Sequence, residues 1–294
     1  MSAGVAWALL AAVGFGVTQT LNRKANLIIG AYRTAFGLLL AVEVLLLVRG
    51  LVTGELAKLA DAPLSALALF TGSATIHYVV GWTLLAKSQH QIGVARTGAV
   101  TSVAPLVATL LAAVFLGESL TVLTVFGVML SVFGVTMVSM SRAPATGGGW
   151  QVPWFGLAVA LCWGSSPMLI RKGLLGLDAP VLGLTVGLGA ALVAGGAALA
   201  MVGGFRPQTW DRTAIGWTIA GGLTGAVGIS SQWISFGLTE VAVAITVQQL
   251  ATLVVVALAP LMFGAVAEKI NALLLGGTAA MLAGSMVVVW AGNG

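Results

Sequence analysis

The sequence has 294 residues, of which 59% are hydrophobic and only 7% are charged. Soluble domains carry about 25% charged residues, so a soluble fold of this length could not cover itself with polar side chains. The net charge of +5 is scattered without a basic cluster, so nucleic acid is not an expected partner. This composition is typical of an integral membrane protein whose surface contacts the lipid bilayer.

Ten apolar runs of spanning length follow one another in two groups of five. The runs are too long for barrel strands, so they predict transmembrane helices and an all-α fold. A glycine-rich loop at 143–152 separates a first domain, 1–142, from a second, 153–294. Polar breaks at 87–91 and 237–240 occupy matching places and predict tight turns. The runs lie near 4–22, 27–48, 65–87, 92–115, 121–141, 153–171, 179–203, 213–237, 240–263 and 271–291.

An internal repeat relates the two domains. The segment 14–24 resembles 162–172 at a shift of 148 residues, and 127–138 resembles 277–288 at a shift of 150 residues. Two matches at nearly the same shift favour duplication over chance. Because each copy holds an odd number of helices, the second copy must enter the membrane upside down. The expected architecture is therefore two inverted five-helix repeats, as in many secondary transporters.

The first helix of each copy ends in an aromatic–Gly pair followed by Arg and Lys, as at 15–24. A run that contains Pro105 leads into the short loop 116–121, and Arg33 lies early in the second run. These features resemble the EamA domain of the drug/metabolite transporter superfamily, as two tandem copies over nearly the whole chain. The second copy departs from the pattern because Ala267 replaces the glycine of that loop.

The resemblance implies a multi-pass carrier of the inner (plasma) membrane with both termini in the cytoplasm. Loop charges alone favour the opposite orientation, but only by seven Lys and Arg residues against four. The family topology is preferred because that excess is small. No basic segment precedes the first run, so a cleaved signal peptide is not expected. Nothing in the sequence fixes an oligomeric state, and a monomer remains open.

Polar side chains inside a membrane are costly unless they face a cavity or a partner. In the third run His77, Tyr78 and Trp82 share one helix face and predict the wall of a substrate cavity. A hydrogen-bonded core histidine with aromatic packing is an equal alternative. Gln19 and Trp163, in the repeated stretch, are further candidates for substrate binding.

Arg96, early in the fourth run, either snorkels to the interface or binds a substrate carboxylate or phosphate. Gln248 and Gln249 are adjacent in the ninth run and cannot both face lipid without a large cost. We expect His77, Trp82, Arg96 and one of these glutamines to line a single cavity between the halves. In the eighth run, a stripe of small and polar residues suits close packing or a cavity wall: Gly228, Ser231, Gln232 and Ser235.

Glu43 is the only carboxylate well inside a run, so a relay of several carboxylates is not predicted, although Glu43 or His77 could titrate. Catalytic motifs and metal-ligand spacings are missing from the sequence, so no enzyme activity, metal or cofactor is predicted. The neutral-to-basic, aromatic inventory favours a small amino-acid-like, zwitterionic or anionic metabolite. Export is the first expectation and uptake or exchange the alternative, ahead of an intramembrane enzyme or a non-transporting subunit.

Overall fold

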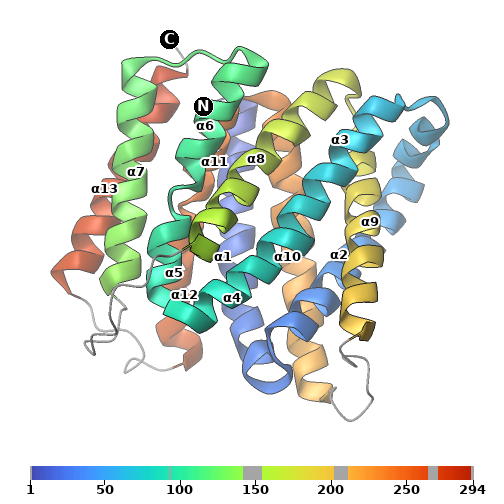
Figure 1. Ribbon diagram of the computed structural model, residues 1–294, viewed down its shortest axis with the longest axis horizontal. Coiled ribbons are helices and arrows are strands. Elements are labelled where there is room, and N and C mark those ends of the chain that lie inside the picture. The colour runs from blue at the N-terminus through green and yellow to red at the C-terminus, as the bar shows by residue number, and fades with distance from the viewer. Residues whose placement is uncertain (1, 93, 142–153, 202–210, 264–270, 293–294) are drawn as a thin grey trace.

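The protein is a bundle of helices, described by a computed structural model over residues 2–92, 94–141, 154–201, 211–263 and 271–292 (Figure 1). No strand occurs in these ranges, which confirms the all-α prediction. The connecting segment 143–152 lies outside them. The helices are α1 (Ala3–Ile29), α2 (Ala31–Thr53), η1 (Glu55–Asp61), α3 (Leu64–Ala74), η2 (Thr75–Gly81), α4 (Trp82–Ile92), α5 (Val94–Thr101), α6 (Ala104–Leu116), α7 (Val122–Ser141), α8 (Trp154–Gly176), α9 (Pro180–Met201), α10 (Arg212–Leu238), α11 (Val241–Gln248), α12 (Ala251–Phe263) and α13 (Ala272–Ala291).

Eight helices in the described ranges are long and apolar enough to cross a membrane. They are α1, α2, the continuous rod α3–η2–α4, α5–α6, α7, α9, α11–α12 and α13. The helices α8 and α10, with 23 and 27 residues, match spanning lengths but are not among these eight. The chain is therefore a multi-pass membrane protein.

Of the two predicted turns, one is confirmed and one is wrong. The helix α10 ends at Leu238 and α11 begins at Val241, so a turn does lie within 237–240. The residues 87–91 instead belong to α4, which continues to Ile92. This segment contains Lys and Gln but no Gly or Pro, so nothing in it breaks a helix. Polarity alone is a poor marker of a helix end.

Two pairs of long helices lie on opposite sides of the bundle, with α7 and α13 on one side and α2 and α9 on the other (Figure 1). The first pair is antiparallel, because Gly127 faces Gly284 and Gly134 faces Gly277. A Cβ atom added at Gly134 would lie 2.6 Å from the Gly277 carbonyl oxygen. Only glycine permits so close an approach of two backbones.

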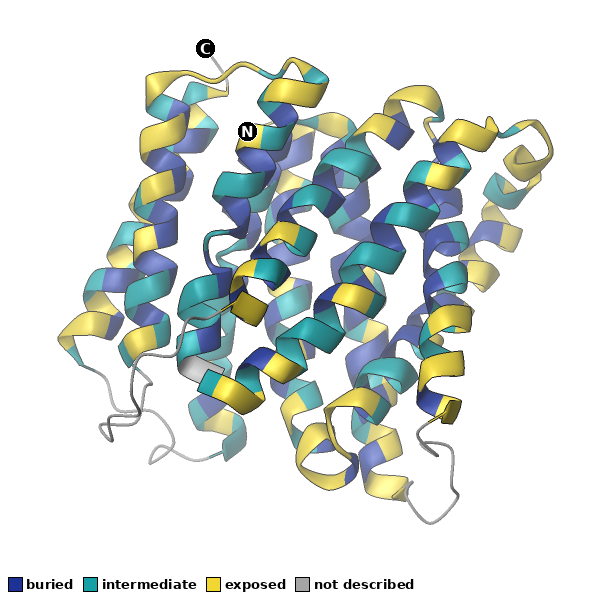
Figure 2. Ribbon diagram, in the orientation of Figure 1, coloured by how far each residue is buried: buried dark blue, intermediate teal, exposed yellow. Residues whose placement is uncertain are grey.

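The helices α2 and α9 are also antiparallel, because Phe36 lies by Gly196 and Glu43 lies by Gly189. Between the two outer pairs, α1 packs on α10 and α8 packs on α3, η2, α4 and α6. The interior of this arrangement is buried, whereas exposed residues gather on the outer helix faces (Figure 2). One large core cluster holds Phe70, Trp233 and Phe236, and thus joins α3 to α10.

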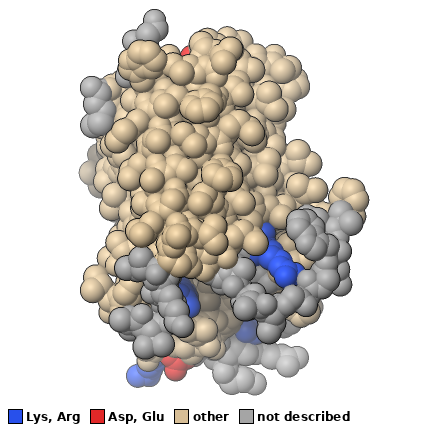
Figure 3. Space-filling model, turned by 90° about the vertical axis from the view of Figure 1, so that its left-hand side faces the viewer, with Lys and Arg blue, Asp and Glu red and all other residues tan. Residues whose placement is uncertain are grey.

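The outer surface suits contact with lipid. On the side of α7 and α13, the surface carries no charged side chain over most of its height, and Lys and Arg appear near one end (Figure 3). Large apolar side chains such as Val122, Phe133 and Met286 are more than half exposed there. A bilayer would cover this band, since large exposed apolar surfaces are rare in soluble monomers.

Candidate functional site

His77 lies in η2, a π-helical segment within the third long helix (Thr75–Gly81). Its Nδ1 atom lies 3.2 Å from the hydroxyl oxygen of Ser166 in α8. Its ring also stacks on Trp163 of α8, with ring centroids 5.7 Å apart and an interplanar angle of 21°. Short π-helical segments inside α-helices frequently mark functional sites. The predicted imidazole is thus held at a contact between η2, in the first half of the sequence, and α8, in the second half.

Ser166 orients the imidazole and joins the two helices. The Ser73 hydroxyl lies 3.0 Å from the Ser166 hydroxyl and donates to the Ser166 carbonyl at 3.1 Å. Ser73 is fully buried and Ser166 nearly so. The contact with Ser166 occupies Nδ1 of His77. The other ring nitrogen, Nε2, makes no hydrogen bond within the described residues.

Together with His77, three aromatic side chains form a cluster of rings: Tyr78, Trp82 and Trp163. Tyr78 packs on His77 at 4.6 Å between ring centroids and meets Trp82 edge-on at 5.4 Å. The indole Nε1 of Trp163 is buried and has no hydrogen-bond partner in the described part of the chain. A Cβ atom added at Gly81 would lie only 2.8 Å from this nitrogen. An unsatisfied buried donor costs about 1–3 kcal/mol, which a ligand with an acceptor atom would recover.

The predicted glutamines belong to a different cluster. Gln248 is buried, accepts a hydrogen bond from Gln232 Nε2 at 2.8 Å and donates to the Ser235 hydroxyl at 3.1 Å. Both partners belong to the predicted stripe on α10, so Gln248 joins α10 to α11. Gln249 is half-buried at the break between α11 and α12, and its backbone N–H bonds to Thr246.

Arg96 and Gln19 do not belong to the aromatic cluster. Arg96 is half-buried in the first turn of α5 and already has an interaction partner. Gln19 is exposed on α1. Of the predicted set, the ring contacts therefore unite only His77, Tyr78, Trp82 and Trp163. The single cavity wall expected from His77, Trp82, Arg96 and a glutamine stays a prediction.

A polar cluster at the end of the bundle was not predicted. The Arg171 guanidinium of α8 donates to the carbonyl oxygens of Phe236 at 2.8 Å and Gly237 at 2.6 Å, at the end of α10. Its Nε atom lies 3.9 Å from Glu118 Oε1. Glu118 comes from the loop before α7 and accepts a hydrogen bond at 2.8 Å from Val241 N, the first residue of α11. The cluster thus joins the two domains at this end.

Burial raises the pKa of Glu118 to about 7, and the neighbouring Glu240 adds to this rise. The backbone N–H groups of α11 and the Arg171 charge lower the pKa, but burial prevails. Glu240 itself accepts a hydrogen bond from the Ser119 hydroxyl at 3.0 Å. The sequence could have suggested Glu118 from its place in a loop, but not Arg171 as its neighbour.

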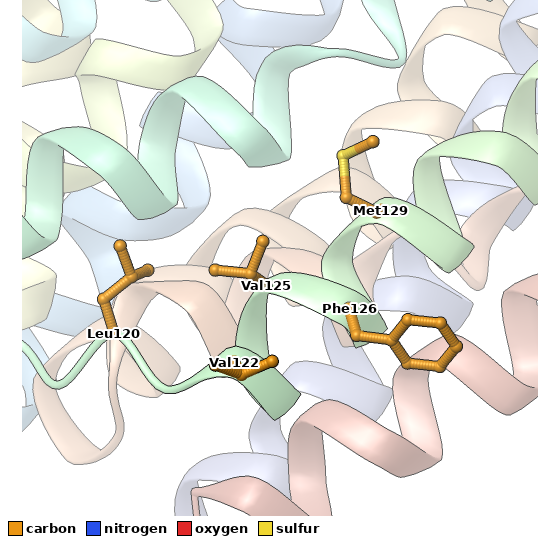
Figure 4. Close-up of a pocket in the computed structure, with 5 residues that line it drawn as sticks. All are labelled: Leu120, Val122, Val125, Phe126 and Met129. Carbon is orange, nitrogen blue, oxygen red and sulfur yellow. The ribbon is translucent and has the colours of Figure 1, made fainter.

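A shallow groove of about 410 Å³ lies elsewhere, on the outer face of α7 (Figure 4). Its lining is entirely apolar, and Val122 is 89% exposed. It contains no group that could bind a polar solute, so the aromatic cluster is the better candidate. No set of three metal-ligating side chains occurs among the described residues. The groove residues are Leu120, Val122, Val125, Phe126 and Met129.

The fold is that of an all-helical, multi-pass membrane protein with a polar, aromatic contact between η2 and α8. Residues 2–140 match the EamA-like transporter family. This match covers 139 of the 294 residues and supports the resemblance of the chain to EamA-type members of the drug/metabolite transporter superfamily. A crystal structure of another protein superposes with a TM-score of 0.80, over 99% of this chain and 97% of that one. Its sequence identity is 17%, so the likeness shows a common fold alone. No curated protein matches the sequence.

Proposed function

We propose that this protein is a secondary transporter that exports a small zwitterionic or anionic metabolite across the inner membrane by alternating access. The observation that carries the proposal is the unpartnered Trp163 Nε1 beside the His77 ring. The two potential donors, His77 Nε2 and Trp163 Nε1, belong to η2 and α8, whose rings stack on each other. An amino-acid-like carboxylate would supply the acceptor that the indole lacks. The proposed site also includes Tyr78, Trp82 and Ser166.

Ten spanning segments in two inverted repeats, 1–142 and 153–294, form the proposed architecture, in which α8 and α10 also cross the membrane. Matching contacts support it. A Cβ atom added at Gly16 would meet Val254 and the Ala251 carbonyl, and one at Gly164 would meet Val107 and the Ala104 carbonyl. The second set repeats the first at a nearly constant sequence shift. The antiparallel course of α7 against α13 is also the one that inversion requires.

Both termini are proposed to be cytoplasmic. In support, the two ends of the chain lie at one end of the bundle (Figure 1). Gly4 lies against Thr239, and Gly292 lies against Val243, both near the start of α11. An even number of spans would produce this arrangement. The polar cluster of Glu118 and Arg171 occupies the same end.

The test of function starts with a growth-resistance screen across amino acids and analogues, with and without the gene. A solute that the gene protects against is then loaded into proteoliposomes, and its release is measured with product analysis. We expect unchanged solute to cross the membrane. Chemical conversion of the solute would indicate an intramembrane enzyme, and release equal to that of empty vesicles would contradict transport.

The same vesicles test the site. His77→Ala and Trp163→Phe should each raise the apparent binding constant about 10- to 100-fold, if each removes a hydrogen bond to a charged group worth about 1.5–3 kcal/mol. Trp154→Phe is the matched control, because Trp154 lies in the same helix and is 69% exposed. Equal transport by all three variants at equal expression would contradict the proposed site.

A further inference from the structure

A single carboxyl group lies inside a membrane-crossing helix at a contact between the two domains. Glu43 belongs to α2, and a Cβ atom added at Gly189 of α9 would lie 3.3 Å from its Oε1. The residue is 8% exposed, and Oε2 is buried without a hydrogen-bond partner in the described part of the chain. Glycine at 189 leaves room for the carboxyl group. A larger side chain there would displace it.

The surroundings of Glu43 are apolar. Val42, Leu46 and Leu188 come from the same two helices and belong to the main core cluster. An ionised carboxylate without a partner is strongly disfavoured in such a place, whereas the protonated acid is tolerated. The contact of α2 with α9 therefore favours a Glu43 that has bound a proton.

No charged partner on the neighbouring elements compensates Glu43. The helix α9 has no titratable residue, and the only one on α10 is its first residue, Arg212. On α1, Arg23 and Lys24 lie over the rings of Phe263 and Trp217. None of the charged groups on these elements, on η1 or on α2 itself bonds to Oε2 of Glu43. Besides those already named, they are Tyr32, Arg33, Arg49, Glu55, Lys58 and Asp61.

The two ends of the α2–α9 contact differ. At one end Glu55 Oε1 accepts hydrogen bonds from the first backbone N–H groups of α9, Val181 at 2.9 Å and Leu182 at 3.2 Å. Lys58 Nζ also donates to the Asp178 carbonyl at 3.2 Å. Toward the other end, a Cβ atom added at Gly196 would meet the Phe36 ring at 3.2 Å. Polar bonds thus join the two helices at the first end, whereas the ring of Phe36 packs on α9 at the other.

We propose that Glu43 is a proton-binding site whose bound proton holds α2 against α9. Release of the proton leaves a carboxylate that needs water, so the helices separate at the Phe36–Gly196 end while Glu55 keeps the other end closed. Since α2 and α9 belong to different domains, proton binding is thereby coupled to movement between the domains. This coupling rests on the proposed transport function, whereas proton binding at Glu43 does not.

The first experiment tests proton binding alone. Infrared spectra of the full-length protein in lipid should show the C=O stretching band of a buried protonated carboxyl group. The part of this band that belongs to Glu43 should be lost in Glu43→Gln and remain in Glu118→Gln, which removes another buried carboxyl group with a raised pKa. A spectrum in which Glu43→Gln leaves every carboxyl band unchanged across the pH range would overturn the proposal.

The second experiment tests the movement, by spin-label distances in a Cys162→Ala background and without substrate. The pair at Tyr32 and Met201, which are 50% and 83% exposed, reports on the Phe36 end, and the pair at Val52 and Asp178 reports on the Glu55 end. Raising the pH should lengthen the first distance and leave the second unchanged. Glu43→Gln should keep the first distance short at every pH, and Glu43→Asp should retain the response.

The same pH response in Glu43→Gln, or no response in the unsubstituted protein, would overturn the proposed site. Loss of solute flux with the pH response intact would count against the transport function and not against the proton site. The two proposals therefore fail in different measurements.

Discussion

Two helix crossings that correspond through the proposed internal repeat share a similar framework and differ in chemistry. Where α8 crosses α3 and η2, Ser166 contacts Ser73 and His77, and Trp163 stacks on His77. In α1 against α10, Thr18 takes the place of Ser166 and pairs with Thr224 at 2.8 Å. Both crossings thus contain a contact between two hydroxyl groups, but the partner has changed, because Gly221 and not Thr224 corresponds to Ser73.

The second crossing is closer and less polar. The positions that correspond to His77 and Trp163 there are Gly225 and Phe15. A Cβ atom added at Gly14 would lie 2.6 Å from the Gly228 Cα atom, and the corresponding residues of the first crossing are Cys162 and Val80. Small residues let helices approach in a membrane, and larger ones hold them apart. The α1–α10 crossing is therefore mainly a packing contact, whereas the α8–η2 crossing contains the polar groups of the proposed site.

The largest effect is expected on protein stability, from a substitution where α1 crosses α10. Gly14→Leu drives a side chain into the backbone of α10, where neither chain can yield easily. Overpacking of this kind costs about 1–3 kcal/mol, and a backbone collision costs more. We expect a marked fall in the melting temperature and in the yield of folded protein. Cys162→Leu, at the corresponding position of the other crossing, should fold nearly normally. Equal loss in the two variants would break the comparison.

The next largest effect is expected where α8 crosses η2. Trp163→Phe introduces there the residue that occupies the corresponding position, Phe15, in the first copy. Folding should be little changed, because Phe keeps an aromatic ring at this position. The apparent binding constant should rise about 10- to 100-fold, since the indole N–H is lost. Gly81→Ala should act in the same direction by placing a methyl group against Nε1. If Gly81→Ala alone impairs transport, crowding of the helices and not the N–H group is responsible.

A smaller effect concerns the Glu118 cluster, which joins the ends of the two domains. In the folded protein the pKa of Glu118 is raised from 4.5 to about 7. The protonated Glu118 therefore stabilises the fold, and this stabilisation is complete below pH 4.5. This stabilisation is lost as the pH rises through about 7. The melting temperature should therefore fall as the pH is raised from 4.5 to 7. The corresponding loss of unfolding free energy is about 3 kcal/mol at most. Glu118→Gln should flatten the profile, and an unchanged slope would contradict the assignment.

The smallest effect should come from Ser166→Ala, which removes the hydroxyl shared by Ser73 and His77. The loss is about 0.5–1.5 kcal/mol, because the Ser73 hydroxyl keeps the Ser166 carbonyl as an acceptor. Thr18→Ala should cost a similar amount of stability without any effect on solute binding. A binding defect in Thr18→Ala would indicate that both crossings face the solute.

Much of the fold could be predicted from the sequence, because hydropathy and the repeat both act over long stretches. The wall of His77, Tyr78 and Trp82 followed from helical spacing, and Trp163 followed from the repeat. The π-helical form of 75–81 could not be predicted, since it depends on how α3 and α4 pack on α8. The same holds for the bond of Gln248 to α10, because a polar residue in a span does not reveal its partner.

A structure with the transported solute bound tests the central claim most directly. The solute should lie between η2 and α8, stacked on the wall of His77 and Trp163. An acceptor oxygen should lie within about 3.2 Å of Trp163 Nε1, the range of an N–H···O hydrogen bond. A solute bound at the Gln248 cluster, with Trp163 Nε1 still unpartnered, would contradict the account.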